Sequence, residues 1–157
     1  MVQRQQTAGS ETAAPRRLAL AHGPARSGAA ESDQHVEWSF PAKAESPGRM
    51  RSKLRSVLAA WEVRGEKAED VLLVATELVA NAVDHARTPL RFQARLRAEG
   101  LRLTVHDRRA DLLPSPTDAG PHSLRGRGLR VIDVLSRCWG CDPAPDGKTV
   151  WAELAFP

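Results

Sequence analysis

The stretch from Glu77 to Ala86, which reads ELVANAVDHA, decides how the rest of this chain is interpreted. Glu77, Asn81 and His85 are spaced four residues apart, so on a helix they line one face. A carboxylate, an amide and an imidazole on a half-buried helix cost desolvation energy unless something pairs with them. The spacing therefore predicts a polar face that needs partners from elsewhere in the fold.

Two interpretations of this face are open. No lysine or arginine occurs between Lys67 and Arg87, so no neighbouring basic side chain neutralises Glu77. The face can look into a site that holds a hard cation and a water molecule. Alternatively, it is the wet side of an amphipathic helix, with Asn81 and His85 bonded to nearby loops.

The composition indicates one globular domain. With 157 residues, 41% hydrophobic and 27% charged, the chain is long enough to bury a sizeable core. No apolar run approaches the length of a membrane span, and the N-terminal region lacks the continuous apolar core of a signal peptide. We therefore expect a cytoplasmic protein with no membrane partner.

The charge pattern argues against nucleic-acid binding, although the net charge is +4. Basic and acidic residues are interspersed along most of the chain, and the densest basic cluster has no aromatic residues between its charges. We interpret this cluster as a solvated helix face and expect no direct nucleic-acid partner. Its members are Arg49, Arg51, Lys53 and Arg55.

Cys138 and Cys141 form a C-x-x-C pair. A redox motif places its first cysteine at a helix N-terminus, where the dipole lowers the thiol pKa. Here Cys138 follows an apolar helical pattern, and no second cysteine pair completes a zinc site. The favoured interpretation is two reduced, buried cysteines near a helix-to-strand junction.

The order of elements predicts the fold. Residues 1–34 lack periodicity and apolar mass, so we expect a disordered tail before one domain at 35–157. Residues 35–41 suggest an edge strand. Ser46 and Pro47 then open a helix, as its N-cap and first turn, which Gly65 stops. The helix that carries Glu77 follows, from about residue 66 to residue 87.

Two hairpins and a third helix complete the pattern. Residues 90–97 and 101–107 alternate around a turn at 99–100, and a loop covers residues 108–125. Apolar positions from Leu129 to Trp139 sketch a helix, and a second hairpin turns at 146–147. This order predicts an α+β fold with a mixed, mainly antiparallel sheet covered on one face by about three helices.

Gly126-Arg127-Gly128 at the start of the third helix predicts a phosphate site. Two glycines let backbone N–H groups turn toward an anion, and the helix dipole and Arg125 add attraction. The same pattern also begins helices that bind nothing. With Asn81 as a Mg²⁺ ligand and Glu77 polarising a water or hydroxyl, it predicts nucleotide chemistry. A P-loop, a kinase-type catalytic loop and a serine nucleophile elbow are all absent from the sequence.

Three stretches resemble motifs of the GHKL ATPases, the superfamily of gyrase, MutL, heat-shock chaperones and histidine kinases. Residues 77–86 resemble its N box, residues 125–129 its later glycine box, and residues 147–151 the Gly-Lys-Thr strand near its end. They occur in the family's order, and the similarity covers about residues 36–156. The branch resembled most is the small, single-domain anti-sigma-factor serine/threonine kinases of actinomycetes.

The resemblance implies a Bergerat two-layer sandwich that binds ATP and Mg²⁺ beneath a lid. Asn81 would coordinate Mg²⁺, and Glu77 would be the general base that activates a serine hydroxyl or a water. Asp107 would accept a hydrogen bond from the adenine amino group, with support from Thr149. The remaining nucleotide-binding residues would be His85, Arg125, Gly126, Arg127, Gly128 and Leu129.

One motif departs from the family. The first glycine box reads Asp-x-Gly-x-Gly, whereas residues 107–111 keep Asp107 and lack both glycines. Glycines there let the backbone approach the nucleotide, so their absence bears on lid geometry and ATP affinity. As an alternative to base recognition, Asp107 is a strand-end residue that caps a turn.

The leading hypothesis is an ATP-dependent serine/threonine kinase that binds a sigma factor and phosphorylates a STAS-type anti-sigma-factor antagonist. The alternative is a module that holds ATP, or nothing, and sequesters a partner. A detached histidine-kinase catalytic domain is disfavoured, because no phosphoacceptor helical hairpin precedes the fold. The family also allows a homodimer, which nothing in the sequence establishes.

Overall fold

The structure, a computed structural model, describes residues 34–111 and 127–156. The predicted disordered tail lies outside the described residues except for Gln34, which begins the first strand. Most of the predicted loop at 108–125 also lies outside them, together with Arg125 and Gly126.

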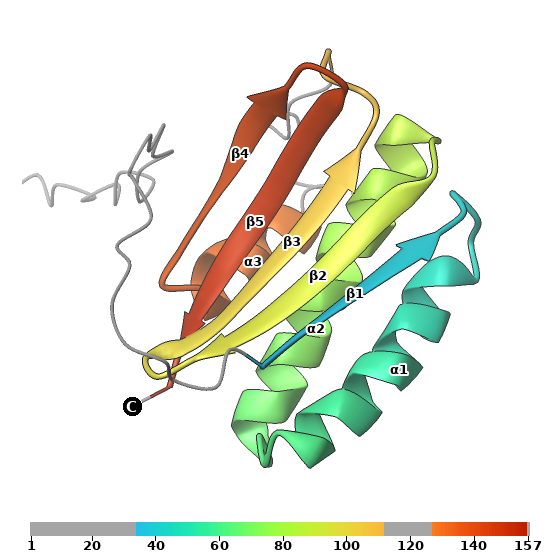
Figure 1. The fold of residues 1–157 in the computed structure, drawn as a ribbon. Coiled ribbons are helices and arrows are strands. Elements are labelled where there is room, and N and C mark those ends of the chain that lie inside the picture. The colour runs from blue at the N-terminus through green and yellow to red at the C-terminus, as the bar shows by residue number, and fades with distance from the viewer. Residues whose placement is uncertain (1–33, 112–126, 157) are drawn as a thin grey trace, which may run out of the picture.

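A five-stranded sheet forms one layer of the domain (Figure 1). Its order is β1-β2-β3-β5-β4, and every neighbouring pair is antiparallel. The alternation in residues 90–97 determines which face of β2 is buried, because the side chains on one face are apolar and those on the other are polar. The strands are β1 (Gln34–Phe40), β2 (Leu90–Arg97), β3 (Gly100–Asp107), β4 (Cys138–Ala144) and β5 (Gly147–Ala155).

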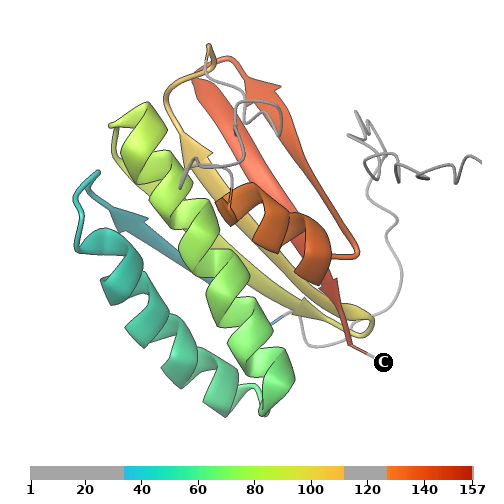
Figure 2. The same ribbon diagram turned by 180° about the vertical axis from the view of Figure 1, so that it is seen from behind.

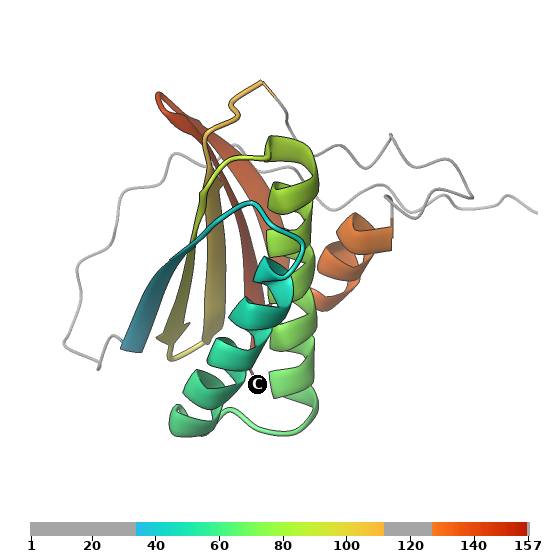
Figure 3. The same cartoon turned by 90° about the vertical axis from the view of Figure 1, so that its right-hand side faces the viewer.

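Three helices form the second layer, and all cover the same face of the sheet (Figures 2 and 3). They are α1 (Ser46–Ala60), α2 (Glu66–Asn81) and α3 (Arg127–Leu135). α2 continues into a π-helical turn, η1 (Ala82–Ala86), as the predicted long helix required. The predicted two-layer α+β fold is confirmed, with an antiparallel sheet throughout the described strands.

The hydrophobic core lies between the two layers. Apolar residues repeat at helical spacing on α1 and α2 and at every second position on the strands, so both layers present continuous apolar faces. Fully buried members include Leu54, Leu58, Val74, Phe92 and Leu103. Burying this face fixes the rotation of α2, which turns its polar face away from the sheet and toward α3. No helix among the described residues is both long and apolar enough to cross a membrane.

Three local predictions were wrong. α1 ends at Ala60, and Gly65 is the N-cap of α2 rather than the residue that stops α1. Ser46 is the first residue of α1 rather than its N-cap, because its buried hydroxyl donates to the Pro41 carbonyl oxygen at 2.7 Å. The third helix ends at Leu135 rather than near Trp139. Trp139 belongs to β4 instead, where it pairs with Ala152.

Candidate active site

The first turn of α3 packs directly on the polar face of α2. A Cβ atom on Gly128 would lie 2.5 Å from Glu77 Oε2 and 3.5 Å from Asn81 Oδ1. A side chain at this position would displace the Glu77 carboxylate, so the glycine lets the start of α3 lie against Glu77 and Asn81 as they stand. The fold brings together the predicted N box and the described part of the predicted glycine box.

Glu77 is half-buried in this junction, and burial raises the pKa of its carboxyl above the ordinary value of 4.5. A carboxylate with a raised pKa is a better proton acceptor than an ordinary glutamate. No cationic side chain of the described residues pairs with it. Its surroundings therefore suit a base more than a structural ion pair.

The oxygen atoms in this junction fit a Mg²⁺ ion that also binds phosphate. Among the described residues, no group of three or more His, Cys, Asp or Glu side chains can hold a metal on its own. Mg²⁺ usually takes one or two protein oxygens and completes its shell with phosphates and water. Asn81 Oδ1 could supply one such oxygen, and the Glu77 carboxylate lies close enough to accept a proton from a nearby water or hydroxyl.

His85 does not share this environment. It lies in η1, where the turn is wider than in an α-helix, and its side chain is exposed. Arg87 ends the turn in a left-handed conformation with φ 53°. Glu77 and Asn81 thus lie half-buried against α3, whereas His85 is exposed in the turn that follows.

Asp107 and Lys148 form a buried ion pair at the ends of β3 and β5. The two residues are directly opposite in the register, and Lys148 Nζ lies 2.8 Å from Asp107 Oδ1. Their side chains are only 1% and 5% exposed. Both face the helix layer, where their strands are otherwise apolar. Lys148 was not predicted as a site residue.

Thr149 lies on the opposite face of the sheet from Asp107. Successive residues of a strand point to opposite faces, so Lys148 occupies the place beside Asp107 that we expected Thr149 to fill. The Thr149 hydroxyl instead lies 3.2 Å from His106 Nδ1, and His106 Nε2 lies 3.5 Å from Asp146. The strand period is the signal that identifies Lys148, since it falls in phase with Val150 and the apolar residues beyond it.

The other predicted contacts are placed in part. Arg127 begins α3, and Leu129 is partly buried against the core. Cys138 and Cys141 are free and half-buried, and Cys138 begins β4 just after α3 ends, at the predicted helix-to-strand junction. Their odd spacing directs them to opposite faces of the strand. Burial raises the pKa of Cys138, and it raises that of Cys141 to about 11, so neither is a ready thiolate.

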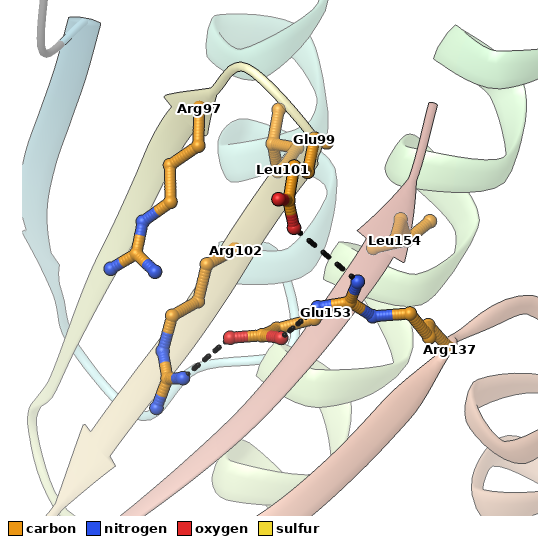
Figure 4. A pocket seen from close by; sticks show the side chains of 8 residues that line it. Arg97, Glu99, Leu101, Arg102, Arg137, Glu153 and Leu154 are labelled. Atoms are coloured by element: carbon orange, nitrogen blue, oxygen red, sulfur yellow. Dashed lines mark hydrogen bonds and ion pairs between the residues drawn. The ribbon is translucent and has the colours of Figure 1, made fainter. Parts of the chain in front are cut away.

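A surface hollow at the far end of β3 is a separate feature (Figure 4). Glu153 accepts from Arg102 at 2.7 Å and from Arg137 at 3.1 Å. Burial alone would raise the pKa of Glu153, but these hydrogen bonds outweigh it and lower the pKa. Arg137 also lies 3.6 Å from Glu99, so these ion pairs link the ends of neighbouring strands on the outer face of the sheet.

The two-layer α+β fold, with Glu77 and Asn81 against the start of α3, fits the GHKL class of ATPase domains. A sequence profile of the histidine kinase-like ATPase domain matches residues 40–154. The chain belongs to this family. No curated protein sequence matches it.

The solved structures that are similar to the chain include the following two. The RsbU and RsbW domains of Rv1364c from Mycobacterium tuberculosis match with a TM-score of 0.58 and 20% identity, over 79% of this chain and 33% of that one. A histidine kinase domain from the Erythrobacter litoralis EL346 blue-light activated histidine kinase matches with a TM-score of 0.47 and 20% identity, over 82% and 65%. This chain thus spans about a third of the first protein, and that likeness supports the fold.

Glu77→Gln is expected to stabilise the folded chain at pH 7. A carboxyl with a raised pKa binds more protons when folded, so stability falls as pH rises from about 4.5 through the folded pKa. Removing the charge removes this loss and adds about 0.5 kcal/mol, the lower end of the range for stabilising substitutions. Urea unfolding at pH 7 and pH 4 measures it. The gain should vanish at pH 4, and a less stable variant at pH 7 would contradict the assignment.

Proposed function

We propose that this chain is an ATP-dependent protein serine/threonine kinase that acts as an anti-sigma factor. The observation that carries the proposal is the meeting of Glu77 and Asn81 with Gly128 at the start of α3. It combines a proton acceptor, an oxygen ligand and the positive end of a helix dipole within one small volume. Phosphoryl transfer depends on positioning and electrostatic stabilisation, and these three elements could supply both.

In the proposed reaction, the Glu77 carboxylate accepts the proton of a serine or threonine hydroxyl. The hydroxyl oxygen forms a bond to the γ-phosphorus of ATP, and the bond from that phosphorus to the β–γ bridging oxygen breaks. ADP leaves with the electron pair of that bond. Mg²⁺, when bound, would neutralise charge on the phosphates, and Asn81 would supply one of its oxygen ligands.

The proposed partners are a sigma factor and a STAS-type antagonist, the latter carrying the target hydroxyl. The likeness of the fold to a structure that includes an RsbW domain and the membership of the kinase-like ATPase family support this assignment. We place the activity in the cytoplasm, where transcription takes place. The chain is not proposed to contact nucleic acid itself.

A second function is favoured by a specific observation. Asp107 is already paired with Lys148, and the adjacent segment, Arg108–Arg109, lacks the family's glycines. A site with this restraint can hold nucleotide without turning it over, or act without it. In that case the chain works by sequestering its partner alone.

Calorimetric titration with ATP, with and without Mg²⁺, tests the proposed function. We expect micromolar, Mg²⁺-dependent binding to the wild type and a loss of at least tenfold in Asn81→Ala, because the variant lacks the amide oxygen that completes the metal shell. Asn81 is half-buried and near the end of α2, so the variant should remain folded by circular dichroism. Absence of ATP binding to the wild type would favour the partner-sequestering function.

A further inference from the structure

Lys148 is the feature that neither the fold nor the proposed chemistry has yet explained. It lies on the face of β5 that carries Ala152 and Leu154 into the core, and it is 4% exposed. A buried ammonium needs a partner, and replacing such a pair by apolar residues often costs no stability. Its presence therefore points to a role beyond holding the sheet together.

The contacts around Lys148 form a closed ring. Asp107 Oδ1 accepts from Lys148 Nζ at 2.8 Å and from the Arg109 backbone N–H at 2.9 Å. Lys148 Nζ also donates to the Arg109 carbonyl oxygen at 2.8 Å. The ring thus fixes both the carboxylate and the backbone two residues after it.

The ring also fixes which oxygen of Asp107 is engaged. Both hydrogen bonds that these described residues give the carboxylate fall on Oδ1. A carboxylate has two oxygens and about four acceptor positions, so Oδ2 is the oxygen that can serve a donor from outside the ring. Because the carboxylate is held in one orientation, Oδ2 can distinguish a ligand that offers an N–H group from one that does not.

The same ring acts where the family's glycines are missing. Arg108 and Arg109 have side chains, so this backbone does not gain its shape from glycine. Two bonds to Arg109, one to its N–H and one to its carbonyl, hold it in place. Lys148 therefore supplies by hydrogen bonding the local geometry that a glycine box would supply by conformational freedom.

We propose that Lys148 is the positioning residue for Asp107 and thereby sets the selectivity of the site for the base of the nucleotide. Oriented by Lys148, the Asp107 carboxylate accepts a hydrogen bond from the exocyclic amino group of adenine. This inference rests on the proposed function, since it assumes that a nucleoside triphosphate enters the site. Lys148 contacts Asp107 and Arg109, and it acts on the adenine ring only by orienting the Asp107 carboxylate.

Competition binding of two nucleotides to the full chain tests the proposal. ATP and purine riboside triphosphate, which lacks the 6-amino group, each displace a fluorescent ATP analogue in the presence of Mg²⁺. We expect the wild type to prefer ATP by about tenfold or more, the size of a hydrogen bond to a charged group. In Lys148→Met the preference should fall to about twofold or less.

Two further variants keep the result interpretable. Lys148→Gln retains a donor on a shorter side chain and should restore part of the preference for ATP. Lys43→Met removes an exposed positive charge away from the ring and should keep the wild-type preference. The ratio of two affinities does not depend on the fraction of folded protein, so a purely structural role for Lys148 would leave it unchanged.

The outcomes separate this inference from the function on which it rests. An unchanged preference in folded Lys148→Met overturns the inference, and so does an unchanged preference in Lys148→Gln if the methionine variant does not fold. Equal binding of both nucleotides by the wild type overturns it while leaving the proposed function intact. If the wild type binds neither nucleotide, the proposed function and the inference fall together.

Discussion

Lys148→Met is expected to lower the free energy of unfolding by about 3–5 kcal/mol, because it leaves Asp107 buried without its counter-charge. A domain of this size has a total stability of about 5–15 kcal/mol, so the loss is a large share of it. Urea unfolding followed by circular dichroism measures the change. The effect should depend on Asp107 being charged.

Two controls isolate that dependence. In Asp107→Asn/Lys148→Met the buried charge is gone, while the amide oxygen still accepts from the Arg109 N–H, so we expect less than half of the single-variant loss. Arg91→Met breaks an exposed pair with Glu37, whose nitrogen and oxygen lie 3.9 Å apart, and should cost less than about 1 kcal/mol. A double variant as unstable as Lys148→Met would show that packing, rather than charge, explains the loss.

Glu77→Gln is expected to slow phosphoryl transfer by about 10²–10⁴-fold while changing ATP affinity by less than about threefold. Glutamine keeps the shape of the side chain and an oxygen atom, but it cannot accept the proton of the attacking hydroxyl. Single-turnover ATP hydrolysis by the chain alone measures the step, with water in place of the serine hydroxyl. The variant should be both more stable and less active than the wild type.

Glu66→Gln is the matched control, since Glu66 is an exposed residue in the first turn of the same helix. It should hydrolyse ATP at the wild-type rate. Hydrolysis that is unchanged in Glu77→Gln would remove Glu77 as the base and favour the partner-sequestering function. A parallel loss of ATP binding would instead assign Glu77 to binding.

The hairpins and the α2 face could be predicted from the sequence because each rests on a local period. Residues 90–97 and 101–107 each alternate throughout, and Glu77 and Asn81 keep helical spacing. Trp139 was misplaced because an apolar residue at that spacing fits a helix as well as a strand. Its pairing with Ala152 decides the matter, and pairing is a long-range property that no local window contains.

In the candidate site, too, local periodicity could be predicted from the sequence, but long-range packing could not. The contact of Gly128 with Glu77 depends on how two helices pack, which spacing alone cannot give. Lys148 was within reach of the sequence, because a single lysine in phase with an apolar strand face is an exception to the pattern. The resemblance to the family predicts Thr149 beside Asp107. Because a shift of one residue in a strand reverses the face, Lys148 lies there instead.

Gly147 and the ring beside it have an evolutionary consequence. A side chain at position 147 would overlap the Asp107 carbonyl oxygen, and its Cβ would lie 2.7 Å from the Arg108 Cα. Because the overlap is with backbone atoms, no second side-chain substitution nearby can relieve it, and position 147 is expected to remain glycine. Residues 107 and 148 are expected to be kept or replaced together, because either charge alone would be buried without a partner. Among descendants of this sequence, Gly147 is thus expected to be invariant, and Asp107 and Lys148 are expected to covary.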